Sequence, residues 1–254
     1  MNIIVCIKQI PDTNDVKWTK DNNIIRDNVI SILNPYDIKA ILTAVEIKKT
    51  VKNSKITLLS MGPDNTIKSL RYGLALGADE AILLSDKKFS GSDTNATSKT
   101  LKAAIQNYIK NFDLIITGQF ALDGDTSQTP YSLASRLNLE ILGYVVEIVS
   151  VNENEITVKQ IKDNGSYLTK CHTPCLISIS DYKKEIKKPS VFDYMKAQDK
   201  KNTILSANDI KIDSKETGVI GSPTYVKRAY RPENKRECKF VESIFELRGE
   251  IFNG

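Results

Sequence analysis

The stretch LIITGQFALDGDTSQ, residues 114–128, decides the fold. A short apolar run ends at a glycine, a polar loop follows, and Leu133 and Leu137 then recur at helical spacing. This order predicts a buried strand that passes through a loop into a helix. We expect Asp125 and Thr126 to provide the N-cap of that helix. Ligands of parallel sheets bind at such loops, beyond the carboxyl ends of the strands.

The same alternation extends outward from this stretch in both directions. Apolar runs predict strands at 3–7, 56–61, 81–84 and 114–117, and later at 144–149, 156–159 and 176–179. Apolar residues at helical spacing predict helices around 38–45, 67–74 and 101–108, with Gly77 as the C-cap of the second. Strands that alternate with helices favour a Rossmann-like α/β fold, in which right-handed crossovers join parallel strands.

Composition places the chain among ordinary globular proteins. Of its 254 residues, 41% are hydrophobic and 26% are charged. No apolar run approaches the roughly 18 residues of a membrane span. The N-terminus has no basic region ahead of a short apolar stretch, so we expect a cytoplasmic protein without a signal peptide.

The sequence lacks the motifs typical of metal binding, nucleophilic catalysis and nucleic-acid binding. The segment 171–175 contains two of the four cysteines and the only histidine, but no second ligand pair accompanies it, so no metal site is expected. No nucleophile motif accompanies His172, and we expect no catalytic side chain. Lysines crowd residues 183–201 without any nucleic-acid-binding signature, which leaves a solvated loop as the simple interpretation.

Polar turns after other predicted strands could converge with the loop on one crevice. These turns lie at residues 8–13, 33–37 and 61–63. Neither a GxGxxG nor a Walker A sequence is present. Thr126 and the first amides of the helix could meet a phosphate, while Asp123 and Asp125 could accept hydrogen bonds from backbone amides, a ribose or an adenine. The alternative is a capped turn without a ligand.

A family resemblance rests on several motifs in order. They are VCIKQIPDT (5–13), LNPYD (33–37), LSMGP (59–63), ALGADEAILLSD (75–86), FSGSDTNATSKTL (89–101), DGDTSQ (123–128) and GSPT (221–224). With these motifs the chain resembles the β subunit of electron transfer flavoproteins over nearly its whole length.

The resemblance implies a heterodimer with a flavin-carrying α subunit and an adenine nucleotide α-hydrolase-like domain that binds FAD or, alternatively, AMP. By position, the implied contacts are Cys6, Lys8, Asn34, Asp37, Met61, Gly62, Gly118, Gln119, Asp123, Gly124, Asp125, Thr126 and Gln128. Asp93, Thr94 and Thr97 are an outer set, for which ordinary helix capping is the alternative.

The opening KQIPDT and the GSPT segment most resemble the clostridial, electron-bifurcating type. That type implies NADH oxidation at the β-bound FAD, with one electron passed to ferredoxin and the other, through the α-bound FAD, to an acyl-CoA or hydroxy-acid dehydrogenase. A simple carrier with structural AMP is the alternative, and an unrelated adenine-nucleotide sensor is disfavoured. Gln119 and Phe120 depart from the family by removing a cation, and Pro130 stands where glycine is usual.

The resemblance also divides the chain. Residues 1–185 are expected to form the α/β domain, 186–202 a recognition loop for the dehydrogenase, and 203–254 a C-terminal arm on the α subunit. Phe240, Ile244, Leu247 and Ile251 form a helical apolar stripe in that arm. An inert charged loop and a stripe packed on its own domain are the respective alternatives.

Overall fold

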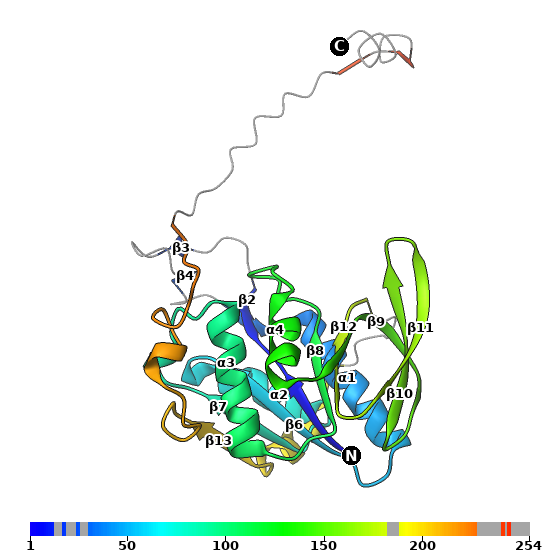
Figure 1. Cartoon of the computed structure of the whole chain (residues 1–254), viewed down its shortest axis with the longest axis horizontal. Coiled ribbons are helices and arrows are strands. Elements are labelled where there is room, and N and C mark those ends of the chain that lie inside the picture. Colours follow the sequence, from blue (N-terminus) through cyan, green and yellow to red (C-terminus); the bar gives the residue numbers. More distant parts are fainter. Residues whose placement is uncertain are drawn as a thin grey trace.

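The computed structural model describes residues 1–12, 17–18, 24–25, 30–181, 188–227, 240–241 and 243–244. The expectations for Thr13, Lys183, Lys184, Lys187, Cys238, Leu247 and Ile251 fall outside these residues. Within them, the predicted α/β fold with a mainly parallel sheet is confirmed (Figure 1). No helix among the described residues is long and apolar enough to cross a membrane.

In the described residues, a nine-stranded sheet runs in the order β11-β10-β9-β12-β8-β1-β6-β7-β13. Its strands are β1 (Asn2–Cys6), β6 (Lys55–Met61), β7 (Glu80–Leu84), β8 (Leu114–Gly118), β9 (Glu140–Val151), β10 (Glu155–Lys162), β11 (Gly165–His172), β12 (Cys175–Ile179) and β13 (Asn202–Leu205). Among the described residues, antiparallel pairing within this sheet is confined to β9 with β10 and β10 with β11. Two small ladders pair β2 (Gln9–Pro11) with β5 (Ser31–Leu33), and β3 (Lys17–Trp18) with β4 (Ile24–Ile25).

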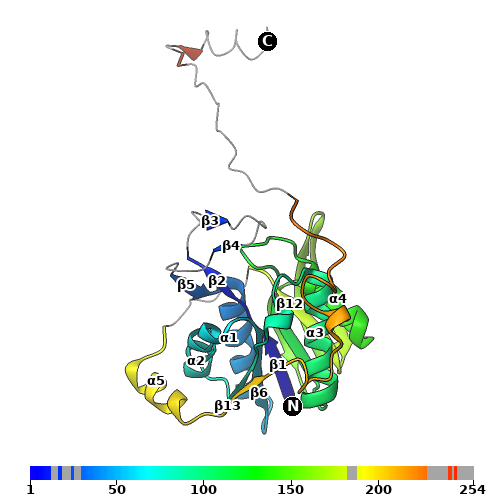
Figure 2. The ribbon, with the colours of Figure 1, turned by 90° about the vertical axis from the view of Figure 1, so that its left-hand side faces the viewer.

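Helices cover both faces of the sheet (Figure 2). The helices α1 (Pro35–Thr50) and α2 (Ile67–Ala75) share one buried apolar cluster with the strands. The helices α3 (Thr94–Ala104) and α4 (Gln128–Leu137) share the cluster on the other face. A π-helical turn, Ile105–Ile109, continues α3, and 3-10 turns lie at Asp64–Thr66, Lys87–Phe89 and Ser214–Glu216. Side chains alternate along β1, where Ile3 and Val5 face α1 and Ile4 faces α3 and α4.

The order of the strands reverses between β1 and β8. The chain runs from β1 through α1 to β6 and through α2 to β7, and then returns through α3 to β8 on the opposite side of β1. In doubly wound sheets, the crevice beyond such a reversal is the usual place for a ligand.

The start of α4 differs from the sequence prediction. Asp125 and Thr126 do not cap the helix, because Ser127 is the N-cap and makes no side-chain capping bond. Asp125 and Ser127 have φ values of 46° and 53°, so the chain makes a tight left-handed turn before Gln128. At the end of α2 the C-cap is Leu76, and Gly77 follows it with φ 127°.

The segment after residue 187 also differs from expectation. The predicted recognition loop contains a helix, α5 (Val191–Gln198), which begins with a capping box between Ser190 and Asp193. The chain then adds β13 to the edge of the sheet, parallel to β7. Ala207 and Ile210, just after β13, are fully buried in the apolar cluster that α3 and α4 share with the sheet.

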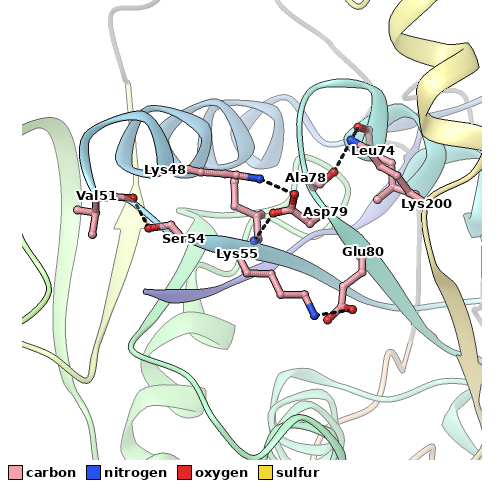
Figure 3. Close-up of polar contacts among 10 residues, drawn as sticks. Lys48, Val51, Ser54, Lys55, Leu74, Ala78, Asp79, Glu80 and Lys200 are labelled. Atoms are coloured by element: carbon pink, nitrogen blue, oxygen red, sulfur yellow. Dashed lines mark hydrogen bonds and ion pairs between the residues drawn. The ribbon is translucent and has the colours of Figure 1, made fainter.

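Polar contacts fix the opposite end of the sheet (Figure 3). Asp79 accepts hydrogen bonds from Lys48 Nζ and, at 2.8 Å, from the backbone N–H of Ile56. Lys200, just after α5, donates from Nζ to the carbonyls of Leu74 at 2.9 Å and Ala78 at 2.6 Å. A cation placed on the last carbonyls of a helix stabilises it, so Lys200 ties the end of α5 to the end of α2.

Candidate functional site

The candidate site begins where Asp37 joins the carboxyl ends of β1 and β8. Its carboxylate accepts hydrogen bonds from the backbone N–H of Lys8 at 2.7 Å and of Gly118 at 3.2 Å. A Cβ atom on Gly118 would collide with Asp37 Oδ1 and with the backbone of Tyr36. Asp37 therefore holds the two strands together at the reversal, and Gly118 permits the close approach.

Burial changes the titration of this centre. Desolvation raises the pKa of Asp37 from an ordinary value of 3.8 to about 7, although hydrogen bonds from Lys8, Asn34 and Gly118 oppose the rise. Burial and then the charge of Asp37 raise the pKa of the neighbouring Cys6 thiol to about 12. Cys6 is therefore a protonated thiol at neutral pH, and Asp37 is close to its titration point.

Asn34 fixes the first half of the site loop, defined as residues 118–128. Its buried side chain donates from Nδ2 to the Phe120 carbonyl at 2.9 Å and accepts the N–H of Leu122 at 3.4 Å. The Phe120 ring lies 4.4 Å from the ring of Tyr36, measured between centroids. Phe120, which departs from the usual sequence of the family, thus has a structural role, because its ring packs the loop against the first turn of α1.

An ion pair closes the site loop over β1. Lys8 Nζ lies 2.6 Å from Asp123 Oδ1, and the Asp123 side chain is only 9% exposed against 43% for Lys8. Asp123 is thus engaged by a cation of its own chain. The pair neutralises an acid that would otherwise repel a phosphate at this position.

The second half of the site loop faces solvent. Gly124, Asp125, Thr126 and Gln128 are exposed, and a Cβ atom added to Gly124 would meet nothing within 4 Å. The N–H groups of Gly124 and Asp125 both donate to the Ala121 carbonyl, at 3.1 and 2.8 Å. The tip is therefore an ordered turn whose outer surface is open to a ligand.

The floor of the site lies on the α3–α4 face. Cys6 and Met61 pack at the margin of the core there, and Gly62 donates its N–H to Leu84 at 3.0 Å. The buried Thr117 belongs to the same region, because strand alternation places it on the face of Ile115. Sequence reasoning missed Thr117, whose only signal is a hydroxyl at the end of an apolar run.

The outer set forms a second cluster, at the start of α3. Asp93 caps the helix by accepting the N–H of Ala96 at 2.9 Å. Its other carboxylate oxygen accepts from Thr224, at 3.1 Å from N and 2.7 Å from Oγ1. Although burial raises the pKa of Asp93, these hydrogen bonds outweigh it and hold the pKa below its ordinary value. Thr94 and Thr97 lie in the same helical turn, so this cluster joins α3 to the GSPT segment.

Other polar features lie away from the reversal. Cys171 donates from Sγ to Glu140 Oε2 at 3.0 Å. Burial is the main cause that raises the pKa of both the Cys171 and the Cys175 thiol. A surface cavity of about 300 Å³ lies beside the end of β7, lined by Lys87, Lys88, Ser90, Ser214, Thr217, Val219 and Ile220. We place the site at β1 and β8 because buried polar groups and exposed loop atoms converge there.

The sheet, its reversal and the two pairs of helices define an α/β protein of the adenine nucleotide α-hydrolase-like type. A family model, electron transfer flavoprotein domain, matches residues 21–209. The chain belongs to the electron transfer flavoprotein β-subunit family. Membership makes it one subunit of a heterodimer with an α subunit and implies that it binds either FAD or AMP.

Curated relatives match along almost the whole chain. The electron transfer flavoprotein subunit beta of Megasphaera elsdenii is 39% identical, over 92% of this chain and 89% of the relative. The caffeyl-CoA reductase-Etf complex subunit CarD of Acetobacterium woodii is 39% identical, over 99% and 96%. Protein FixA of Sinorhizobium fredii is 38% identical, over 95% and 87%.

The residues at the reversal fit an adenine nucleotide. The site loop presents a carboxylate, a hydroxyl and an amide side chain at an open surface, and Lys8 supplies a partly exposed cation beside them. At the floor, the buried hydroxyl of Thr117 has no hydrogen-bond partner among the described residues. Together these groups match a ligand that has both polar edges and a phosphate.

Proposed function

We propose that this chain is the β subunit of an electron-bifurcating electron transfer flavoprotein and that it holds FAD at the β1–β8 reversal. The observation that carries the nucleotide site is the convergence of Lys8, Asp37 and the site loop at the carboxyl ends of β1 and β8. The bifurcating type is supported by the KQIPDT and GSPT motifs and by similarity to a subunit of a caffeyl-CoA reductase-Etf complex.

When bound, FAD would supply the redox chemistry, by taking electrons from NADH and passing them singly to ferredoxin and the α subunit's FAD. The side chains of this subunit would bind the nucleotide and orient it. Asp37 and Asn34 set the position of the site loop, while Asp125, Thr126 and Gln128 supply the exposed groups that would contact the nucleotide. We assign no acid or base to these side chains.

A simple carrier with structural AMP is the second candidate. Gln119 and Phe120 provide no cation in the first half of the site loop, and the Phe120 ring is committed to Tyr36. A cation at this place could contact a flavin or the second phosphate of FAD. Its loss favours the smaller nucleotide, whose single phosphate needs fewer partners.

We propose that α5 docks the partner dehydrogenase, of the acyl-CoA or hydroxy-acid type. One face of α5 packs on α2, where Ala197 is buried and the Tyr194 and Tyr72 rings lie 6.3 Å apart. The other face exposes Val191 and Phe192 at 75% each and Met195 at 58%. Exposed lysines adjoin these apolar residues, which is the composition of an anchor with a steering rim.

We propose that the region after residue 222 packs on the α subunit. Tyr225 and Val226 are 81% and 54% exposed, and Phe240 and Ile244 are 91% and 82% exposed. Large apolar side chains in such number are costly in water and are typical of a protein interface. The α subunit is the partner that family membership supplies.

The deciding experiment measures the nucleotide content of the purified αβ heterodimer. The protein is denatured, and the released FAD and AMP are separated chromatographically and quantified. Two FAD per heterodimer is the result expected of the bifurcating type, and ferredoxin reduction by NADH is then the next assay. One FAD and one AMP would overturn the proposal and make the chain the scaffold of a simple carrier.

A further inference from the structure

Thr117 carries a buried hydroxyl that the chain does not satisfy. The residue is only 6% exposed, and its Oγ1 has no hydrogen-bond partner among the described residues. It ends the run LIIT in β8, where the other three residues are fully buried and apolar. A buried hydroxyl without a partner destabilises a fold, so a valine of the same shape would serve the strand better.

The position of Thr117 points to a ligand rather than to the core. In the sheet register, Thr117 pairs with Cys6 of β1 and with Ser178 of β12, so all three share the face covered by α3 and α4. Ser178 Oγ donates to the carbonyl of Gly118 at 3.5 Å, which is the residue where the site loop begins. The unsatisfied hydroxyl therefore lies under the site loop, at the reversal of the sheet.

We propose that the bound nucleotide completes the hydrogen bonding of Thr117 and that this residue positions the AMP portion common to FAD and AMP. The inference rests on the proposed nucleotide site. A hydroxyl both donates and accepts, so it can pair with a ring nitrogen or with a hydroxyl of the ligand. The chain thus carries an unmet hydrogen bond until the nucleotide is present, which couples binding to stability.

Ser60 offers a matched control within the same sheet. Its Oγ is also buried and also lacks a partner among the described residues. It follows Leu58 at a spacing of two in β6, so it faces α1 and α2 rather than the floor of the site. Replacement of Ser60 removes the same kind of defect from the opposite face.

The test uses nucleotide-depleted αβ heterodimers with an unchanged α subunit, so that differences report on the β chain. FAD and AMP are the probes, their binding is measured by titration calorimetry, and Tm by scanning calorimetry. Thr117→Val is expected to raise the Kd of both probes about tenfold. It is also expected to raise the Tm of the depleted protein by about 2–4 °C, because it removes an unsatisfied group. Thr117→Ser, which keeps the hydroxyl, should bind like the wild type, and Ser60→Ala should leave both Kd values unchanged.

Weaker binding together with a higher Tm of the depleted protein distinguishes a ligand contact from a structural role. A Thr117→Val heterodimer with wild-type Kd values would overturn the inference. A fall in the Tm of the depleted Thr117→Val protein would also overturn it, since the hydroxyl would then be satisfied by the chain itself. If Thr117→Ser bound as poorly as Thr117→Val, the shape of the side chain would be responsible and not its hydroxyl. Absence of FAD and AMP binding in the wild type would instead refute the proposed function.

Discussion

At the scale of single residues, Asp37 shows how one buried carboxylate serves both fold and site. It accepts the N–H groups of Lys8 and Gly118, which lie 110 positions apart in the sequence but adjacent at the reversal. Its pKa of about 7 means that the charge which orders these amides is only partly present at neutral pH. The geometry of the loop and the protonation of Asp37 are therefore linked.

Because burial raises the pKa of Asp37, the folded chain holds a proton between about pH 4 and 7 that the unfolded chain has released. The contribution of Asp37 to stability is therefore largest at low pH. It falls as pH rises through this window, by up to about 1.4 kcal/mol per pH unit. We expect Asp37→Asn to remove this fall, as measured by Tm of the heterodimer between pH 4.5 and 8. A pH profile of the variant parallel to that of the wild type would refute the assignment.

Two substitutions of Asp125 can separate the effect of backbone strain from that of ligand contact. Its φ of 46° is unfavourable for alanine but is tolerated by asparagine. We expect both Asp125→Ala and Asp125→Asn to lower the nucleotide content of the purified heterodimer, because both remove the exposed carboxylate. Only Asp125→Ala should also lower the free energy of unfolding, by about 1 kcal/mol. Full nucleotide content in Asp125→Asn would exclude the carboxylate as a principal contact.

At the scale of elements, α5 combines a fixed face with an exposed one. Phe192 is 75% exposed, so its replacement should not disturb the fold. We expect Phe192→Ser to slow electron transfer to the dehydrogenase at least tenfold, the loss typical of an interface anchor. NADH oxidation with an artificial acceptor should not change. The exposed Gln198 on the same helix provides the control variant Gln198→Ala, and equal effects of both variants would refute the docking role.

Lys200 fixes the end of this element. Burial is the main cause that lowers the pKa of Lys200, yet its ammonium group donates to the carbonyl of Leu74, in the last turn of α2, and to that of Ala78, just after the helix. We expect Lys200→Gln to destabilise the heterodimer by about 1–2 kcal/mol, the range for a partly buried cation at a helix C-terminus. Lys196→Gln, in the exposed part of α5, should have little effect on Tm. Equal Tm losses in the two variants would contradict the capping role.

The elements also show where sequence reasoning succeeds and where it stops. Periodicity predicts the sheet strands β1, β6, β7 and β8 and the helices α1 to α4, because burial imposes the periods of 2 and 3.6. It does not predict the short strands β2 to β5. It also misses β11, most of whose residues other than Cys171 are exposed, and β13, whose pairing with β7 comes from tertiary contact. Capping preference alone misplaces the start of α4, because the left-handed turn at Asp125 and Ser127 delays the helix.

At the scale of the whole molecule, the motifs locate the site but not its internal contacts. The strand ends that carry Lys8, Asn34 and the site loop could be expected to meet, since parallel strands end at one edge. The pairing of Lys8 with Asp123, and the contact of the Phe120 ring with the Tyr36 ring, could not be predicted from spacing. Both depend on side-chain directions that only the assembled sheet defines.

Removal of the nucleotide should change hydrogen exchange mainly near the β1–β8 reversal. We expect depletion to lower Tm, by mass action, and to increase hydrogen exchange mainly in the site loop and the first turn of α1. Exchange in α5 should not change, because α5 packs on α2 and is joined to the site by no direct contact among those described. An equal increase in α5 would show that the docking helix responds to the nucleotide.

The attachment of α5 has a consequence for how such subunits diverge. The helix lies between a capping box at Ser190 and the anchor at Lys200, and the chain re-enters the sheet directly afterwards through β13. The residues on the exposed face of α5 can therefore be substituted without any change in the sheet or in the proposed nucleotide site at the β1–β8 reversal. Under the proposed docking role, substitution of a few solvent-facing positions of α5 would retarget the protein to another dehydrogenase without any change at the proposed nucleotide site.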